Sequence, residues 1–174
     1  SAGYGDEWEG SGGYKRWRDV AADIHAGVEH LVASGQVDPD RVCLVGWSFG
    51  GYASLMTAIE NPDRYRCVVS VAGVTHPRLL LNSLRRNQGD WIRRFRRNQL
   101  PDGEEIRRGS AVSRAEEMTA PVLLLHGDLD VNVSLEHSED LASALRKADK
   151  VVEMIEYEDE DHAIRNKQAN TIDL

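Results

Sequence analysis

An apolar run that ends in Gly46-x-Ser48-x-Gly50, with a helical pattern after it, constrains this chain more than any other stretch. In this pattern the serine is exposed on a sharp turn between a strand and a helix, and we expect the flanking glycines to omit Cβ atoms that would clash there. The N–H groups of the first helical turn then face any negative charge that develops beside the serine. A glycine-rich turn can contain a serine by chance, but the strand before it and the helix after it favour a nucleophile.

Composition sets the broad class. The chain has 174 residues, of which 41% are hydrophobic, so we expect one folded domain over residues 1–174 and exclude a disordered chain. The formal net charge of -8 argues against binding to nucleic acid or to an anionic membrane. The first residues are polar and glycine-rich and no apolar run has bilayer length, so we expect no signal peptide or transmembrane segment and favour the cytoplasm.

Strand and helix patterns alternate along the chain. Apolar runs predict strands over 41–46, 67–72, 121–126 and 151–157. Three-residue and four-residue spacings predict helices over 14–34, 50–60 and 134–148, with a glycine-rich loop over 1–13. This alternation is typical of an α/β protein with a parallel sheet flanked by helices.

The segment 73–118 is less regular and rich in arginine. Trp91 and Phe95 lie one helical turn apart within it, which suggests a short helix with inward aromatic side chains. We favour a solvated helix over an anion or nucleic-acid site, because the whole chain is acidic; arginines at the rim of a site that favours acidic ligands are a third reading. The arginines are Arg85, Arg86, Arg93, Arg94, Arg96 and Arg97.

Three chemically complementary residues follow three of the predicted strands. Ser48 follows the first, Asp130 the third and His162 the fourth. Carboxyl ends of parallel strands meet at one sheet edge, and the order Ser, Asp, His is that of α/β-hydrolases. We therefore predict a catalytic triad, in which the backbone N–H of Phe49 is one oxyanion donor.

The predicted site residues also have simpler interpretations. His162 is also consistent with a solvated loop histidine, and Asp128 competes with Asp130 for the acidic role. The neighbouring acidic residues Asp159, Glu160 and Asp161 are a candidate metal site, but such a run is more typical of a solvated charged loop. His76 follows the second strand and is a candidate substrate contact, although a loop histidine without a role is the simpler reading.

The two cysteines give little functional information. Cys43 and Cys67 each fall in a predicted strand, and we expect small buried apolar side chains. A disulfide between neighbouring strands is the alternative. We expect no metal site and no organic cofactor.

The segment 46–52, Gly-Trp-Ser-Phe-Gly-Gly-Tyr, resembles the nucleophile segment of the prolyl oligopeptidase family of serine peptidases. The segments 110–113, 120–127 and 160–162 are similar to the approach to the acid strand, the acid strand and the histidine loop of that family, and 1–5 is similar to its Gly-Tyr-Gly segment. The resemblance implies an α/β-hydrolase fold, assigns the acid to Asp130 rather than Asp128, and makes Trp47 and Tyr52 candidate substrate contacts.

The resemblance also implies differences from a complete family member. Ala163 stands where the family usually has glycine, and the chain begins midway through the hydrolase domain. We expect a C-terminal part of that domain that lacks the first strands and the second oxyanion donor. Such a part keeps the triad but has little peptidase activity, and its open edge at 41–45 favours self-association.

The leading function is hydrolysis of short peptides or acylated amino acids by an acyl-enzyme mechanism. An esterase is the alternative within the same chemistry, because the triad is shared and only the leaving group differs. A catalytically weak interaction domain is the alternative from another class.

Overall fold

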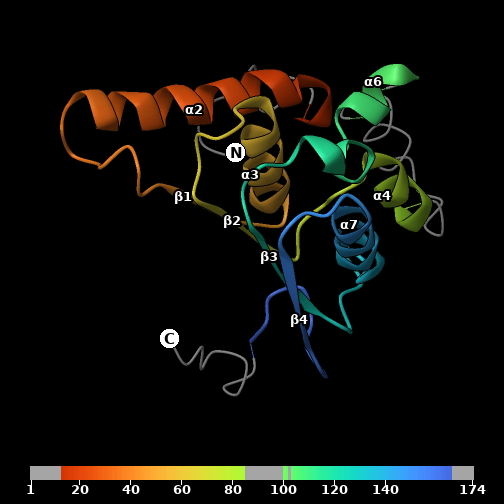
Figure 1. Ribbon diagram of the computed structural model, residues 1–174. Coiled ribbons are helices and arrows are strands. Elements are labelled where there is room, and N and C mark those ends of the chain that lie inside the picture. Colours follow the sequence, from red (N-terminus) through yellow and green to blue (C-terminus); the bar gives the residue numbers. More distant parts are fainter. Residues whose placement is uncertain (1–12, 85–99, 102, 166–174) are drawn as a thin grey trace.

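Four parallel strands form the sheet in the part of the chain that the structure describes, a computed structural model of residues 13–84, 100, 101 and 103–165 (Figure 1). They lie in sequence order, β1-β2-β3-β4, and every neighbouring pair is parallel. Their bounds are Cys43–Trp47 for β1, Cys67–Val71 for β2, Val122–Gly127 for β3 and Val152–Tyr157 for β4. The predicted strands agree with these bounds to within two residues, and the predicted α/β class is confirmed.

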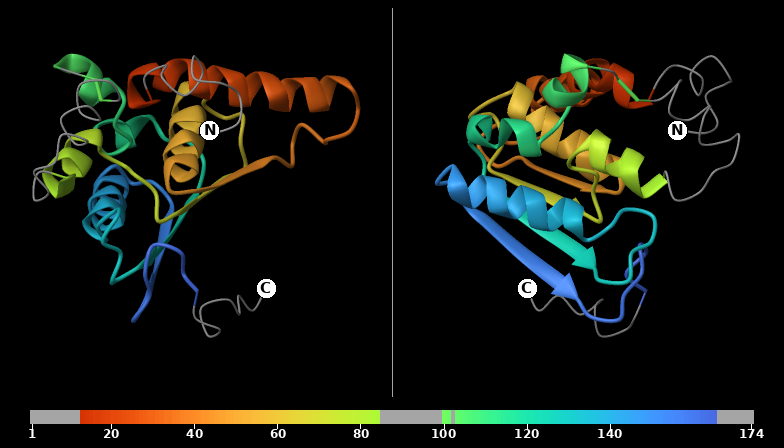
Figure 2. Two further views of the ribbon diagram at one scale, coloured as in Figure 1. Left: turned by 180° about the vertical axis from the view of Figure 1, so that it is seen from behind. Right: turned by 90° about the vertical axis from the view of Figure 1, so that its right-hand side faces the viewer.

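Helices on one face of the sheet enclose the core. The 3-10 turn η1 (Gly13–Arg16) leads into α2 (Trp17–Ala33), which packs on α3 (Phe49–Glu60), and α7 (Glu136–Lys147) packs on β3 and β4 (Figure 2). The three long helices lie within three residues of their predicted bounds. Shorter elements fill the segment between β2 and β3, namely α4 (Pro77–Leu84), α6 (Glu104–Arg108) and the 3-10 helix η2 (Val112–Glu117). The predicted helix around Trp91 and the arginines at 85–97 lie outside the described residues.

Burial alternates between the two faces of the sheet along β1 and β2. Leu44, Val68 and Leu124 point to the helices and are buried in the core. On the opposite face Val45 is 69% and Trp47 is 53% exposed. A continuous apolar run such as 41–46 is typical of a parallel strand covered on both faces, whereas at β1 the described residues cover only one face.

The two cysteines form a disulfide, so the expectation of two buried thiols is wrong. Cys43 and Cys67 are partners in the parallel register of β1 and β2, with their Cα atoms 4.7 Å apart. That separation suits a disulfide. Cys43 is exposed and Cys67 half-buried, both on the uncovered face of the sheet.

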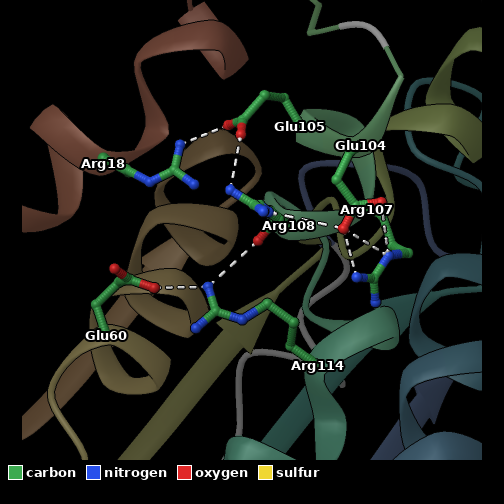
Figure 3. A network of polar contacts seen from close by, with 7 residues as sticks. All are labelled: Arg18, Glu60, Glu104, Glu105, Arg107, Arg108 and Arg114. Carbon is green, nitrogen blue, oxygen red and sulfur yellow. Dashed lines mark hydrogen bonds and ion pairs between the residues drawn. The ribbon is translucent and has the colours of Figure 1, made fainter.

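A network of ion pairs ties the short elements to the long helices (Figure 3). Arg114 on η2 is the hub: its guanidinium lies 2.5 Å from Glu60 on α3 and 2.6 Å from Glu117, and its side chain is only 16% exposed. Arg18 on α2 pairs with Glu105 on α6 at 2.5 Å. A cavity of about 310 Å³ lies within this network, and each arginine in its lining pairs with a carboxylate. These positive charges are balanced internally, which does not favour an anion site.

None of the helices in the described part of the chain has the length and apolar character that crossing a membrane requires.

Candidate active site

Ser48 lies on the turn between β1 and α3, since β1 ends at Trp47 and α3 begins at Phe49. Its φ of 57° and ψ of -118° are rarely adopted by residues other than glycine. The Ser48 N–H donates to the carbonyl of Val71 on β2 at 2.8 Å, which fixes the turn to the sheet. Strained backbone held in this way is found mainly at functional sites.

Glycines allow α3 to start so close to the sheet. A Cβ atom on Gly46 would lie 2.1 Å from the carbonyl oxygen of Gly50, which confirms the predicted close approach. The same prediction for Gly50 is wrong, because a Cβ atom there has nothing within 4 Å. The second close approach is at Gly51, whose Cβ would lie 2.5 Å from Ser70 Oγ and 3.0 Å from Gly73 Cα.

The structure brings Ser48, His162 and Asp130 together from three strand ends. His162 follows β4, and its Nε2 lies 3.0 Å from Ser48 Oγ. Its Nδ1 lies 2.6 Å from Asp130 Oδ2. An ionised carboxylate only accepts hydrogen bonds, so Nδ1 carries the proton and Nε2 of the neutral ring accepts from the serine hydroxyl.

Asp130 is buried and fully bonded. Its Oδ1 accepts from the N–H of Asn132 at 2.8 Å and of Val133 at 2.9 Å. Burial raises the pKa of Asp130, but hydrogen bonds from His126, His162 and these two N–H groups outweigh it and hold the pKa below its usual value. The carboxylate is therefore ionised at neutral pH.

Asp128, the competing acid, has a different position. Its Oδ1 accepts from the N–H of Glu160 at 3.3 Å, and the N–H of Leu129 donates to the Glu160 carbonyl at 2.9 Å. A Cβ on Gly127 would lie 2.3 Å from that same carbonyl. Asp128 and Gly127 therefore join the loop after β3 to the loop that carries His162.

Trp47 contacts His162. Its indole N–H donates to the backbone carbonyl of His162 at 2.8 Å, and the two ring centroids are 5.0 Å apart. About half of the indole remains exposed beside Ser48. Its position next to the serine is compatible with the predicted substrate contact.

The other predicted site residues lie in different surroundings. Phe49 is the first residue of α3, where the N–H has no intrahelical acceptor. Tyr52 is fully buried and donates its hydroxyl to the Gly109 carbonyl at 3.0 Å, which speaks against a substrate contact. His76 lines a cavity of about 350 Å³, and none of Ser48, Asp130 and His162 is among the described residues that line it. Burial, followed by the charge of Arg78, lowers the pKa of His76.

His126 is the site residue that sequence reasoning missed. It lies near the end of β3, is fully buried, and its Nε2 is 3.2 Å from Asp130 Oδ2. The sequence feature that could have indicated His126 is its position at the end of an apolar strand, four residues before Asp130.

Groups of three or more His, Cys, Asp or Glu side chains suited to hold a metal ion are absent from the described residues. Of the acidic run after β4, Asp159 and Asp161 are exposed, whereas Glu160 is buried and accepts from the N–H of Arg165 at 2.8 Å.

Comparison with known proteins identifies the family. A sequence model of the prolyl oligopeptidase family matches residues 1–174. The chain belongs to this family. It is 31% identical to human dipeptidyl peptidase 8 over 172 residues, which cover 92% of this chain and 18% of that protein. It is also 31% identical to pig dipeptidyl peptidase 4 over 141 residues, 78% of this chain and 17% of that protein.

Solved structures show the same fold. A puromycin-hydrolyzing peptidase of Mycobacterium tuberculosis superposes with a TM-score of 0.77 at 25% identity, over 86% of this chain and 23% of that one. Dipeptidyl peptidase 4 of Porphyromonas gingivalis gives a TM-score of 0.76 at 23% identity, over 94% of this chain and 22% of that one. The sheet and helices are therefore the α/β-hydrolase fold of these peptidases. The chain spans about a fifth of the length of these relatives.

Proposed function

We propose that this chain carries the catalytic triad of a serine peptidase and hydrolyses short peptides or acylated amino acids through an acyl-enzyme intermediate. The observation that carries the proposal is the unbroken hydrogen-bonded series from Ser48 Oγ to His162 at 3.0 Å and from His162 to Asp130 at 2.6 Å. Nucleophile, base and orienting acid thus stand in the geometry that nucleophilic catalysis requires.

In the first half-reaction Ser48 Oγ attacks the substrate carbonyl carbon while its proton moves to His162 Nε2. The imidazolium that forms is stabilised by the ionised Asp130 at Nδ1. The tetrahedral oxyanion accepts a hydrogen bond from the N–H of Phe49 at the start of α3. When the C–N bond breaks, the amine leaves with the proton of His162 Nε2, and the acyl group remains on Ser48.

Water completes the cycle by the same steps. His162 Nε2 takes a proton from the water that attacks the acyl carbonyl. The proton returns to Ser48 Oγ as the ester bond breaks, which frees the acid and restores the triad. Trp47 flanks this site, and we assign it to the substrate surface beside the serine.

Relatives named dipeptidyl peptidase support a substrate with a free amino terminus, and a solved acylaminoacyl peptidase from Pyrococcus horikoshii supports an acylated one. Both kinds of substrate contain an amide, whose poor leaving group needs the general acid His162.

The test is hydrolysis of matched amide and ester substrates. Dipeptide and N-acyl amino-acid p-nitroanilides are compared with the corresponding p-nitrophenyl esters, using wild type, Ser48→Ala and His162→Ala. We expect slow amide cleavage that both substitutions abolish. Ester cleavage without amide cleavage would point to an esterase, and turnover that survives Ser48→Ala would contradict the proposed nucleophile.

Self-association is the second part of the proposal. Among the described strands β1 is an edge strand, paired only with β2, and its residue Val45 is largely exposed on one face of the sheet. Exposed strand edges are templates for pairing with a second chain.

A further inference from the structure

His126 connects the acid of the triad to the rigid core. It lies on β3, one residue before the strand ends at Gly127, and its side chain is completely buried. Its Nε2 lies 2.8 Å from the carbonyl oxygen of Val133 and 3.2 Å from Asp130 Oδ2. Its Nδ1 lies 2.7 Å from Ser138 Oγ on α7. One ring thus touches the acid loop, which we define as residues 128–133, and the helix that packs behind it.

These contacts place a proton on Nε2 of the ring. Both neighbours of Nε2, the Val133 carbonyl and the ionised Asp130, can only accept hydrogen bonds, so Nε2 carries a proton. Nδ1 of the neutral ring then accepts from the hydroxyl of Ser138. Both ring nitrogens have partners, and the ring has one orientation that satisfies all of them.

The two oxygens of Asp130 are held by different groups. Oδ1 is fixed by the N–H groups of Asn132 and Val133, which belong to the acid loop itself. Oδ2 faces His162, from a loop, and His126, from the sheet. Asp130 Oδ2 orients His162, so His162 cannot also hold Oδ2 in place. The partner that fixes the position of Oδ2 is therefore His126.

We infer that His126 is a positioning residue for the proposed reaction: it clamps the acid loop to β3 and α7 and holds Asp130 Oδ2 where it accepts the Nδ1 proton of His162. The inference rests on the proposed function, because it assigns His126 to the same triad. It does not make His126 a group that touches substrate.

His137 offers a matched comparison. It is also a fully buried histidine, one residue before Ser138 on α7. Its Nδ1 accepts from the N–H of Thr75 at 3.2 Å, and its Nε2 has no hydrogen-bond partner among the described residues. Among the described residues His137 hydrogen-bonds to Thr75 and not to Asp130, so replacing it removes a buried imidazole without removing a hydrogen-bond partner of Asp130.

The experiment measures two quantities in wild type, His126→Leu, His126→Gln and His137→Leu, after circular dichroism has established that each is folded. One is the rate at which a fluorophosphonate labels Ser48. The other is the tautomer of each histidine ring, read from ring ¹⁵N shifts, with resonances assigned by the variants. The glutamine amide can replace the Nε2–H donor, whereas leucine cannot.

We expect His126→Leu to label about 10- to 100-fold more slowly, the loss that corresponds to one hydrogen bond to a charged group. His126→Gln should recover most of this loss, and His137→Leu should label within about twofold of wild type, as expected for a residue outside the network. In wild type His126 should be protonated at Nε2 and His162 at Nδ1. His126→Leu should reduce the preference of His162 for the Nδ1–H tautomer and leave the tautomers of the other histidines unchanged.

Full-rate labelling of His126→Leu would overturn the inference and leave the proposed function standing. A wild-type His126 protonated at Nδ1, or a folded His126→Gln as slow as His126→Leu, would also overturn it. Wild type that is not labelled, but whose His162 tautomer depends on His126, would refute the proposed function and support the positioning role.

Discussion

Gly46 and Gly50 flank Ser48 in the sequence, yet they have opposite surroundings in the structure. A Cβ on Gly46 would lie 2.1 Å from a backbone oxygen, and one on Gly50 would meet nothing. We expect Gly46→Ala to lower the free energy of unfolding by about 3 kcal/mol, at the upper end of overpacking costs. Gly50→Ala should stay within about 1 kcal/mol of wild type, since alanine is favoured in a helix. Urea denaturation checks both, and equal effects would contradict the close approach.

His137 makes stability depend on pH. Burial, followed by the neighbouring imidazoles of His126 and His76, lowers the pKa of His137 to about 3 in the folded chain. The unfolded chain therefore binds a proton near pH 6.5 that the folded chain does not, and the stability from neutral His137 is lost as pH falls from there toward 3.

The measurement is the free energy of unfolding between pH 7 and pH 4. We expect wild type to lose stability more steeply than His137→Leu, by up to about 1.4 kcal/mol per pH unit, the limit for one proton. If the free energies of unfolding of wild type and His137→Leu depend on pH in the same way, the pKa of His137 is not lowered by folding.

The positions of Ser48, Asp130 and His162 were predictable because each follows a strong apolar run, and parallel strands bring such positions to one edge. His126 was not, because its function depends on which face of β3 it points from and on what the acid loop places there. The burial of Tyr52 was missed for the same reason: its helical position relative to the sheet is not visible in the nucleophile segment.

At the scale of elements, the disulfide fastens the edge strand β1 to β2. It closes a segment with a sequence separation of 24 residues. We expect reduction, or the double substitution Cys43→Ser with Cys67→Ser, to lower the free energy of unfolding by about 3 kcal/mol on the chain-entropy account.

Denaturation with and without dithiothreitol checks this expectation. The double variant is the control, because it should not respond to the reductant. Wild type whose midpoint is unchanged by full reduction would contradict a stabilising disulfide.

The strands and long helices were predicted from the sequence because their apolar spacing is regular over many residues. The disulfide was not, since it depends on β1 and β2 being neighbours in a register that places Cys43 opposite Cys67. The short elements between β2 and β3 have few residues each, too few for a spacing to be recognised.

At the scale of the whole molecule, we propose that copies of this chain associate through β1, which is an edge strand among the described strands. We expect sedimentation velocity to show a concentration-dependent dimer. Val45→Lys should weaken it, because a charge beside an edge strand opposes pairing. Leu31→Lys on α2 adds the same charge elsewhere and should leave the dimer intact. A monomer at all concentrations would contradict association through β1.

The most direct test of the central claim is fluorophosphonate labelling of wild type, Ser48→Ala and His162→Ala, with the modified residue mapped by mass spectrometry. The account predicts labelling at Ser48 that disappears in both variants, because the hydroxyl reacts only when His162 accepts its proton. Labelling at another residue, or at Ser48 with equal rate in His162→Ala, would contradict an activated Ser48.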